Sequence, residues 1–496
     1  MNIISIDPDP TFALSPYLYM QFAEPLGNAD SSIDASWDFI AEKWQPKAVE
    51  IVKRLAPPML RWGGCFSSYY HWKEAVGPMA ERKPMHNLCW DGIYLNHVGT
   101  AELAEFAKLV GGAELLFCVN YESDGRMHWA YPCPGQDRLG TAEEAAEWVR
   151  YCNDPDDKLR RSHGFESPFQ VNYWQIGNET SYDKRGFSSQ QNTSKACEFI
   201  NAMRGADPNL KLIVWGDGPN DEWQARYLAG QTCPWTKEIC EAVGDTAEMV
   251  AFHNHFGGGP KYTALHGTEY RQDPDLTWEK SLEASRDFED RILYMENSVA
   301  PYGRKLAITE GHFVLRGRHR GDLLSSWYAG IAYARCANIL ERHGHTVEIA
   351  TLADFMGNRW QNNAIMLPTP IWTNDVAYFL PVGTIMGLFS QHMGKQAVSV
   401  KAPDGIDVSA SRTGDRLFLH IVNLSRTQAK PLRFAVPGIT ATPTRILEIS
   451  PNPDDEVSSA CADIFAPHEV APAEEYTLPA AAVCVMELEM HQAPQD

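Results

Sequence analysis

Two short apolar segments of the chain each lead into a glutamate. Tyr173–Ile176 precedes Asn178 and Glu179, and Lys305–Thr309 precedes Glu310. Both segments have the pattern of a buried strand, and a (β/α)8 barrel carries its catalytic groups at the C-terminal ends of its parallel strands. Two carboxylates that face each other there could hydrolyse a glycosidic bond, one protonating the leaving oxygen and the other acting as base or nucleophile.

The separation of the two carboxylates would decide the stereochemical outcome, because about 5–5.5 Å permits direct attack on the sugar and retention of configuration. Nearby carboxylates resist ionising together. We therefore expect one glutamate to be the ionised nucleophile, and the other to keep its proton as the acid and later activate water as a base. Asn178, beside Glu179, is placed to bind the 2-hydroxyl of the sugar.

The composition is that of a large acidic protein. The chain has 496 residues, of which 44% are hydrophobic, and its formal net charge is -21. This charge disfavours nucleic acid and anionic membranes as partners, whereas a neutral carbohydrate is indifferent to it. No signal peptide and no run of about 18 apolar residues is visible. Eleven cysteines without a pattern indicate reduced thiols, so we expect a cytoplasmic protein.

Strand-like and helical segments alternate along most of the chain. The strand-like runs are Tyr17–Phe22, Pro58–Trp62, Glu114–Asn120, Asn172–Ile176, Lys211–Trp215, Met249–His253, Lys305–Thr309 and Thr346–Leu352. The helical segments are Trp44–Leu55, Thr100–Val110, Ala142–Cys152, Thr193–Ala206, Thr236–Val243, Leu282–Ala300 and Leu323–Arg342. This alternation predicts a parallel sheet with crossover helices, and eight strands is the number that closes a TIM barrel.

An open doubly wound sheet is the alternative to a barrel. A polar side chain lies at or just after the end of every predicted strand: Glu24, Arg61, Asn120, Asn178, Asp217, His253, Glu310 and Asp354. A doubly wound sheet gathers its ligand contacts near one switch point, whereas a barrel collects them from nearly every strand. The distribution of polar residues therefore favours the barrel.

The pattern of predicted elements changes after about residue 395. Short alternating strands separated by Gly, Pro, Asn and Asp follow, which is typical of a β-sandwich. The early strand Asn2–Ile6 precedes the predicted barrel, and we expect it to join this sandwich. We therefore predict a (β/α)8 TIM barrel over residues 16–392 and an all-β, jelly-roll-like sandwich domain made of residues 1–15 and 393–496.

Five motifs, in this order, resemble those of glycoside hydrolase family 51, the retaining α-L-arabinofuranosidases of the (β/α)8-barrel clan A. They are Phe22–Gly27, Leu60–Phe66, Trp90–Gly92 with Asn96–Thr100, Trp174–Glu179 and Ala307–Glu310. The resemblance implies that Glu179 is the acid/base and Glu310 the nucleophile. It also implies that Glu24, Cys65 and Asn178 contact the sugar.

Further candidates complete the expected site. The remaining candidates for substrate binding are Trp90, Asn120, His253, His255 and Asp354, and Arg61 is expected to orient a buried carboxylate. His255 replaces a tyrosine of the family pattern that leans on the nucleophile, and Asp354 replaces a sugar-binding glutamine. The chain is thus identified as a divergent member.

The function implied by the resemblance is hydrolysis of terminal α-L-arabinofuranosyl or similar residues from oligosaccharides, through a glycosyl-enzyme intermediate. We expect no cofactor and no metal, and the resemblance suggests a homo-oligomer. An endo-β-glucanase or a β-xylosidase on the same barrel is the main alternative. More remote alternatives are a non-catalytic sugar-binding protein and a metal-dependent amidohydrolase, which would hold zinc with His253, His255, His312 and Asp354.

Overall fold

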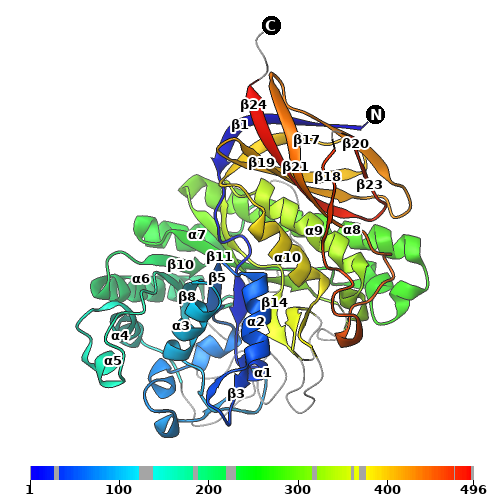
Figure 1. Ribbon diagram of the computed structural model, residues 1–496. Helices are drawn as coiled ribbons and strands as arrows, with labels where there is room; N and C mark the ends of the chain where they lie inside the picture. Colours follow the sequence, from blue (N-terminus) through cyan, green and yellow to red (C-terminus); the bar gives the residue numbers. More distant parts are fainter. Residues whose placement is uncertain are drawn as a thin grey trace.

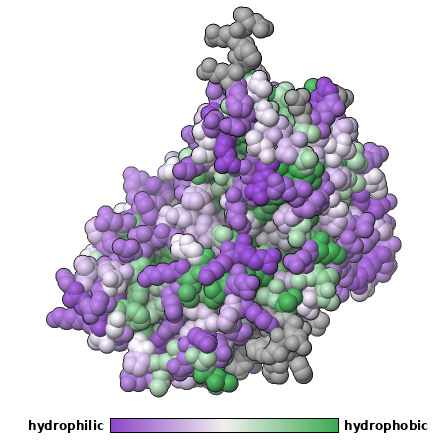
Figure 2. Space-filling model, in the orientation of Figure 1, coloured by the Kyte–Doolittle hydropathy of each residue, from purple (hydrophilic) through white to green (hydrophobic). Residues whose placement is uncertain are grey.

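The computed structural model describes residues 2–26, 33–121, 138–182, 188–218, 231–315, 321–358, 362–367, 376–473 and 475–492. It contains an α/β part built around a parallel sheet and a β part stacked on one end of it (Figure 1). The first and the last strand of the chain, β1 (Asn2–Ala13) and β24 (Val483–Gln492), both lie in the β part (Figure 1). Polar side chains cover much of the face seen in Figure 2.

Eight parallel strands follow one another in chain order across the α/β part. They are β2 (Gln21–Ala23), β5 (Met59–Trp62), β8 (Glu114–Val119), β9 (Tyr173–Ile176), β10 (Lys211–Trp215), β11 (Met249–Phe256), β12 (Lys305–Phe313) and β13 (Val347–Ala350). Each overlaps one of the eight predicted runs, so the strand predictions are confirmed. The strands β11 and β12 continue beyond their predicted ends.

The first and the eighth of these strands lie beside each other. Tyr17, just before β2, forms a parallel bridge with Ile349 of β13. The backbone N–H of Met20 donates to the carbonyl of Ala350 at 2.8 Å, and the N–H of Ala350 donates to that of Tyr17 at 3.0 Å. This connectivity is the one expected of a (β/α)8 barrel.

Helices follow the strands and cover the sheet. They are α2 (Pro46–Leu55), α3 (Thr100–Leu109), α4 (Ala142–Asn153), α6 (Ser189–Ala206), α7 (Pro234–Val243), α8 (Pro274–Val299) and α9 (Trp327–Arg342). Each lies on one of the seven segments predicted to be helical.

Helix α2 illustrates why these segments fold as they do. It begins with Pro46, whose fixed φ suits the first turn of a helix. Ala48, Ile51, Val52 and Leu55 are spaced to lie on one face and are buried. Burying each larger apolar side chain contributes roughly 1.5–3 kcal/mol, so the apolar face fixes the helix against the sheet.

Several elements were missing from the sequence-based prediction. They are α1 (Ile33–Ser36), β3 (Trp37–Asp38), β4 (Lys43–Trp44), β6 (Met85–His86), β7 (Ile93–Tyr94), α5 (Lys158–Ser162), β14 (Asp354–Gly357), β15 (Asn363–Met366), β16 (Tyr378–Phe379) and α10 (Pro381–Gln391). Helix α10 was missed because residues 381–389 are all buried, and a helix that is apolar on every side lacks the amphipathic period. Asp354 pairs with Phe22 of β2, so it begins a strand rather than a loop.

The β part is one hydrogen-bonded sheet. Its strands, in spatial order, are β22 (His468–Val470), β21 (Ile439–Ile449), β24 (Val483–Gln492), β19 (Arg416–Asn423), β18 (Ile406–Thr413), β17 (Gln396–Lys401), β1 (Asn2–Ala13), β20 (Lys430–Ala435) and β23 (Glu475–Leu478). The N-terminal strand β1 pairs with β17 and β20, which confirms that the N-terminus joins this part of the molecule.

The sheet folds back on itself around a core of its own. Tyr476 of the last strand, β23, donates a hydrogen bond to Glu448 of β21, near the other end of the sheet. The enclosed apolar cluster includes Ile4, Ile446 and Met486 and is separate from the large core of the α/β part. The exact boundary near residue 392 stays a prediction; α10 ends at Gln391.

The two parts are joined through a buried polar contact. Glu341 of α9 accepts hydrogen bonds from Tyr19 and Ser409, each at 2.6 Å, and lies 2.9 Å from His420. Because each of these side chains is nearly inaccessible to water, the contact fixes the β part on the α/β part. None of the helices among the described residues combines the length and the apolar character needed to cross a bilayer.

Candidate active site

Arg61 and Glu310 meet although they lie on strands far apart in the order of the parallel sheet. Arg61 lies in β5 and Glu310 in β12, and Arg61 Nη1 donates a hydrogen bond to Glu310 Oε1 at 3.1 Å. Arg61 is 1% and Glu310 is 8% exposed. A guanidinium that is buried and always charged holds the carboxylate in one orientation and favours its ionised form. The orienting role of Arg61 in catalysis stays a prediction.

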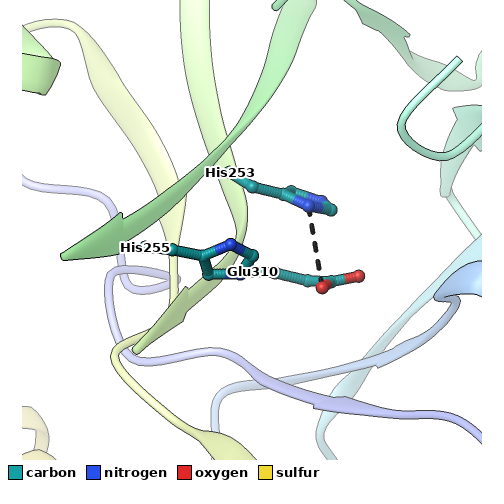
Figure 3. Close-up of side chains that lie close together, drawn as sticks. All are labelled: His253, His255 and Glu310. Carbon is teal, nitrogen blue, oxygen red and sulfur yellow. Dashed lines mark ion pairs between the residues drawn. The ribbon is translucent and has the colours of Figure 1, made fainter. Parts of the chain in front are cut away.

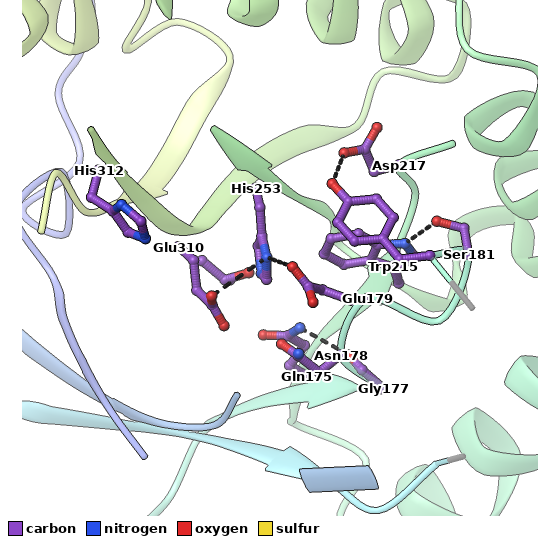
Figure 4. A network of polar contacts seen from close by, with 12 residues as sticks. Gln175, Gly177, Asn178, Glu179, Ser181, Trp215, Asp217, His253, Glu310 and His312 are labelled. Atoms are coloured by element: carbon purple, nitrogen blue, oxygen red, sulfur yellow. Dashed lines mark hydrogen bonds and ion pairs between the residues drawn. The ribbon is translucent and has the colours of Figure 1, made fainter. Parts of the chain in front are cut away.

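Glu179 is presented by an unusual turn at the end of β9. The backbone φ of Gly177 is 79° and that of Glu179 is 52°, a left-handed conformation that non-glycine residues rarely adopt. A Cβ on Gly177 would lie 2.6 Å from Thr180 Cγ2 and 2.7 Å from Tyr121 Cδ1, so glycine is required there. The turn directs the Glu179 side chain inward, toward β11 and β12 (Figure 4).

His253 of β11 lies between the two glutamates (Figure 4). Its Nδ1 is 2.7 Å from Glu179 Oε1 and 3.6 Å from Glu310 Oε2. The separation of these two oxygens cannot exceed the sum of the two distances, which admits the roughly 5–5.5 Å typical of retaining glycosidases. Side chains that are 131 residues apart in the chain are thus brought to one nitrogen atom.

The electrostatics of this group resist full ionisation. Burial raises the pKa of the Glu310 carboxyl, against the opposing effects of His253 and Arg61, and the nearby Glu179 and Asp354 raise it further. Burial also lowers the pKa of His253 to about 4, so the imidazole is neutral near pH 7. A neutral imidazole can share a proton with Glu179 without adding a charge to the pocket.

Asn178 is held with its amide nitrogen available. Its Oδ1 accepts a hydrogen bond from Arg61 Nη2 at 2.6 Å. Its Nδ2 is buried and has no hydrogen-bond partner among the described residues. An unsatisfied buried donor is costly unless a ligand completes it, so this amide is suited to a sugar hydroxyl, as expected for Asn178.

Gln175 is a site residue that the sequence-based prediction missed. It accepts a hydrogen bond from Arg61 Nε at 2.9 Å and donates from its Nε2 to the carbonyl of Gly177 at 2.8 Å. It thereby links the orienting arginine to the turn that presents Glu179. A polar residue inside the apolar run Tyr173–Ile176 was the signal that could have identified it.

Glu24 and Cys65 lie together on the β2–β5 side of the site. A Cβ on Gly64 would lie 2.1 Å from Glu24 Oε2, so only glycine permits this close approach of the backbone. A hydrogen bond with Cys89 and burial raise the pKa of the Cys65 thiol, and Glu24 and Glu179 raise it further. Cys65 is therefore a neutral thiol facing the acids, and its contact with the sugar stays a prediction.

His255, His312 and Asp354 form a further group near Glu310. The ring centroids of His255 and His312 are 4.5 Å apart, and His312 Nε2 lies 3.8 Å from Asp354 Oδ1. The predicted ligands His255 and Asp354 are thus near the nucleophile, and their roles remain predictions. His312 joins them, although the sequence suggested it only for the zinc-site alternative.

Asn120 and Trp90 are the two remaining predicted sugar contacts. Asn120 donates its amide to the carbonyls of Tyr70 at 3.2 Å and Arg138 at 2.8 Å, so it ties two loops together. Trp90 is partly buried and packs against the large core. Sugar binding by Asn120 and Trp90 stays a prediction.

A buried ion pair contacts the backbone of His253. Asp217 pairs with Arg291 and accepts a hydrogen bond from Tyr182 Oη at 2.6 Å. Arg291 Nε also donates to the backbone carbonyl of His253 at 3.3 Å. Because this network fixes the backbone at His253, it restricts the position of the imidazole between the two acids.

One group of side chains among the described residues could hold a metal ion. The donor atoms of His253, His255 and Glu310 lie within 4.8 Å of one another. This group includes Glu310 instead of the His312 and Asp354 of the amidohydrolase alternative.

Comparison with known proteins places the chain near one group of enzymes. The model of the α-L-arabinofuranosidase 1 domain matches residues 51–263. Alpha-L-arabinofuranosidase C of Emericella nidulans is 28% identical over 316 residues, which cover 62% of this chain and 58% of that protein. The exo-alpha-(1->6)-L-arabinofuranosidase of Bifidobacterium longum is 27% identical over 267 residues, covering 50% and 46%. The chain thus spans about half the length of the curated relatives it matches.

Similarity to solved structures extends over the whole chain. The α-L-arabinofuranosidase of Thermotoga maritima, solved as an arabinose complex, has a TM-score of 0.74 at 21% identity, covering 99% of this chain and 100% of that one. A family 51 α-L-arabinofuranosidase from Bifidobacterium longum has a TM-score of 0.78 at 17% identity, covering 98% and 99%. At such identities the similarity establishes the fold, which extends through the C-terminal β part.

Proposed function

We propose that this chain, an arabinofuranosidase-like protein of glycoside hydrolase family 51, is a retaining glycosidase that removes terminal α-L-arabinofuranosyl residues from oligosaccharides. The observation that supports the proposal best is that Glu179 and Glu310 contact the same nitrogen of His253 from two different strands. We interpret the parallel sheet as a closed (β/α)8 barrel, with the two acids at the C-terminal ends of its fourth and seventh strands.

The proposed reaction has two steps. Glu310, ionised and oriented by Arg61, attacks the anomeric carbon while Glu179 gives its proton to the departing oxygen. A glycosyl–enzyme ester then forms on Glu310. In the second step Glu179, now a carboxylate, takes a proton from water, which attacks the same carbon and releases the sugar with its original configuration.

His253 and Asn178 assist without forming covalent bonds. The neutral imidazole of His253 holds Glu179 Oε1 at 2.7 Å and orients the acid in both steps. Asn178 Nδ2 binds the 2-hydroxyl, a contact that strengthens as positive charge develops on the ring. Both effects stabilise the transition state more than the bound substrate, which is what accelerates a reaction.

The proposal is tested with a panel of aryl glycosides: α-L-arabinofuranoside first, with β-xyloside, β-glucoside and galactofuranoside for comparison. We expect turnover of the arabinofuranoside, and NMR of the first product formed should show the α-anomer. An inverted first product contradicts the retaining mechanism. Cleavage of β-glucan or a β-xyloside alone favours the endo-β-glucanase or β-xylosidase alternative.

The assembly and location of the protein belong to the same proposal. We propose a homo-oligomer acting in the cytoplasm on short oligosaccharides. Light scattering coupled to size-exclusion chromatography tests the first point, because a mass of 55.6 kDa identifies a single chain. Fractionation of the source cells tests the second.

A further inference from the structure

Three side chains of the catalytic pocket form a group that suits a metal ion. His253 and His255 are two residues apart on β11 and therefore point to the same face of the strand. Glu310 lies on the neighbouring β12, in register with His253. The donor atoms of the three residues lie within 4.8 Å of one another, and Figure 3 shows the two rings beside the carboxylate.

The donor set is that of known zinc sites. Two imidazole nitrogens and one carboxylate oxygen bind Zn²⁺ at about 2.0–2.2 Å and leave a fourth position open. Ligand atoms of such a tetrahedral site lie roughly 3.3–3.5 Å apart. His253 Nδ1 is already 3.6 Å from Glu310 Oε2. The His255 ring packs beside the ring of His253, with their centroids 5.7 Å apart.

The charges around the group favour a cation. Glu310 Oε1 is bonded to Arg61, which leaves Oε2 on the side of His253. Asp354 is a further buried acid that interacts electrostatically with Glu310. A pocket in which carboxylates outnumber the nearby guanidinium concentrates divalent cations.

We propose that Zn²⁺ binds to His253, His255 and Glu310 and reversibly blocks the catalytic pocket. An ion ligated by Glu310 occupies the oxygen needed for attack on the sugar, so zinc and substrate exclude each other. The blocking effect rests on the proposed function, whereas the binding does not.

Calorimetric titration of the metal-free full-length chain with ZnCl₂ tests the binding. We expect one Zn²⁺ per chain, and a loss of affinity of about 100-fold or more in His255→Phe, since even groups behind the ligands affect metal affinity about 10–100-fold. His345→Phe is the matched control, because His345 and His343 form a separate cluster with Glu296, at 3.6 and 2.9 Å. We expect zinc affinity of this control to be unchanged.

Loss of affinity in His345→Phe with none in His255→Phe overturns the proposal. If the His255→Phe variant does not fold, crystals of the unaltered chain grown with Zn²⁺ provide the test instead. An anomalous difference peak between His253, His255 and Glu310 supports the site, and a peak elsewhere or none overturns it.

Enzyme kinetics then test whether bound Zn²⁺ blocks the catalytic site. We expect Zn²⁺ to raise the apparent KM for the aryl arabinofuranoside with little change in kcat, and EDTA to reverse the effect. Zinc bound at the three residues without any inhibition overturns the block. If no glycoside of the panel is hydrolysed, the proposed function fails, while calorimetry and the anomalous peak still decide the binding.

Discussion

Arg61 Nη1 donates a hydrogen bond to Glu310 Oε1 at 3.1 Å, across 249 residues of sequence. The same guanidinium bonds Asn178 and Gln175, so one buried cation positions groups from β9 and β12 together. A guanidinium has donors in a fixed planar fork, and it can therefore set the relative orientation of several acceptors at once. The predictions below follow from this arrangement and its surroundings.

Arg61 is predicted to set the acidic limit of activity. Burial raises the pKa of Glu310 while Arg61 lowers it, and the nucleophile must be ionised to attack. In Arg61→Met the pKa of Glu310 rises further, so we expect the acidic limb of kcat/KM to move up by about 1 pH unit or more. The half-exposed Arg54 supplies the control, Arg54→Met, whose pH profile should match that of the unaltered chain. An unchanged profile in Arg61→Met argues against this role.

Glu179 is predicted to be the acid/base. In Glu179→Ala we expect turnover of a substrate with a poor leaving group to fall about 10²–10⁴-fold. Turnover of an activated aryl glycoside should fall much less, because its leaving group needs little protonation. Azide should accelerate the second step and yield a glycosyl azide of retained configuration, since it needs no general base. Absence of both effects would show that another residue donates the proton.

Asn178 is predicted to bind the 2-hydroxyl of the sugar in the transition state. Because its Nδ2 is a buried donor without a partner among the described residues, Asn178→Ala should lower kcat about 10²–10³-fold with a small change in KM. A 2-deoxy substrate provides the control. This substrate should react slowly with the unaltered chain, and Asn178→Ala should lower its rate little further. If the substitution and the missing hydroxyl instead lower the rate by independent factors, the 2-hydroxyl is bound by another residue.

Gly177 is predicted to be needed for the turn that presents Glu179. Gly177→Ala introduces a Cβ 2.6 Å from Thr180 Cγ2 at a φ of 79°, so we expect both lower stability and a lower kcat. Gly303→Ala is the matched control, because its φ is 61° but no atom lies within 4 Å of the added Cβ. It should cost only about 1 kcal/mol and leave kcat unchanged. Equal effects of the two substitutions on kcat contradict the prediction.

His343 is predicted to make the folded state less stable at alkaline pH. Burial alone lowers its pKa, but the carboxylates of Glu289 and Glu296, 3.5 and 2.9 Å from its ring nitrogens, outweigh burial and raise it to about 9. The unfolded value is about 6.5. The stabilisation is therefore complete below pH 6.5 and is lost as the pH rises through 9. We expect a loss of about 2–3 kcal/mol in the free energy of unfolding.

Urea unfolding at pH 6 and pH 9.5 measures this dependence. In His343→Gln the free energies of unfolding at pH 6 and pH 9.5 should differ by about 2–3 kcal/mol less than in the unaltered chain. A difference equal to that of the unaltered chain would mean that other groups cause the alkaline loss.

The sequence by itself determined the order of strands and helices and the two glutamates. Alternation of apolar runs and amphipathic segments is a local property, so each of the eight strands could be located from its own residues. Glu179 and Glu310 could be singled out as candidates because each follows such an apolar run in the sequence. The N-terminal strand was correctly assigned to the β part because it precedes the first strand of the parallel sheet.

Only the tertiary structure decided how the polar groups meet. The contacts of His253 with both acids, the links from Gln175 to Arg61, and the place of Asp354 at the start of β14 depend on strand register and on loops between distant segments. Helix α10 was hidden because it is buried on every side. Periodicity records which face of an element is apolar, whereas a distance between two side chains is set by the packing of all the elements between them.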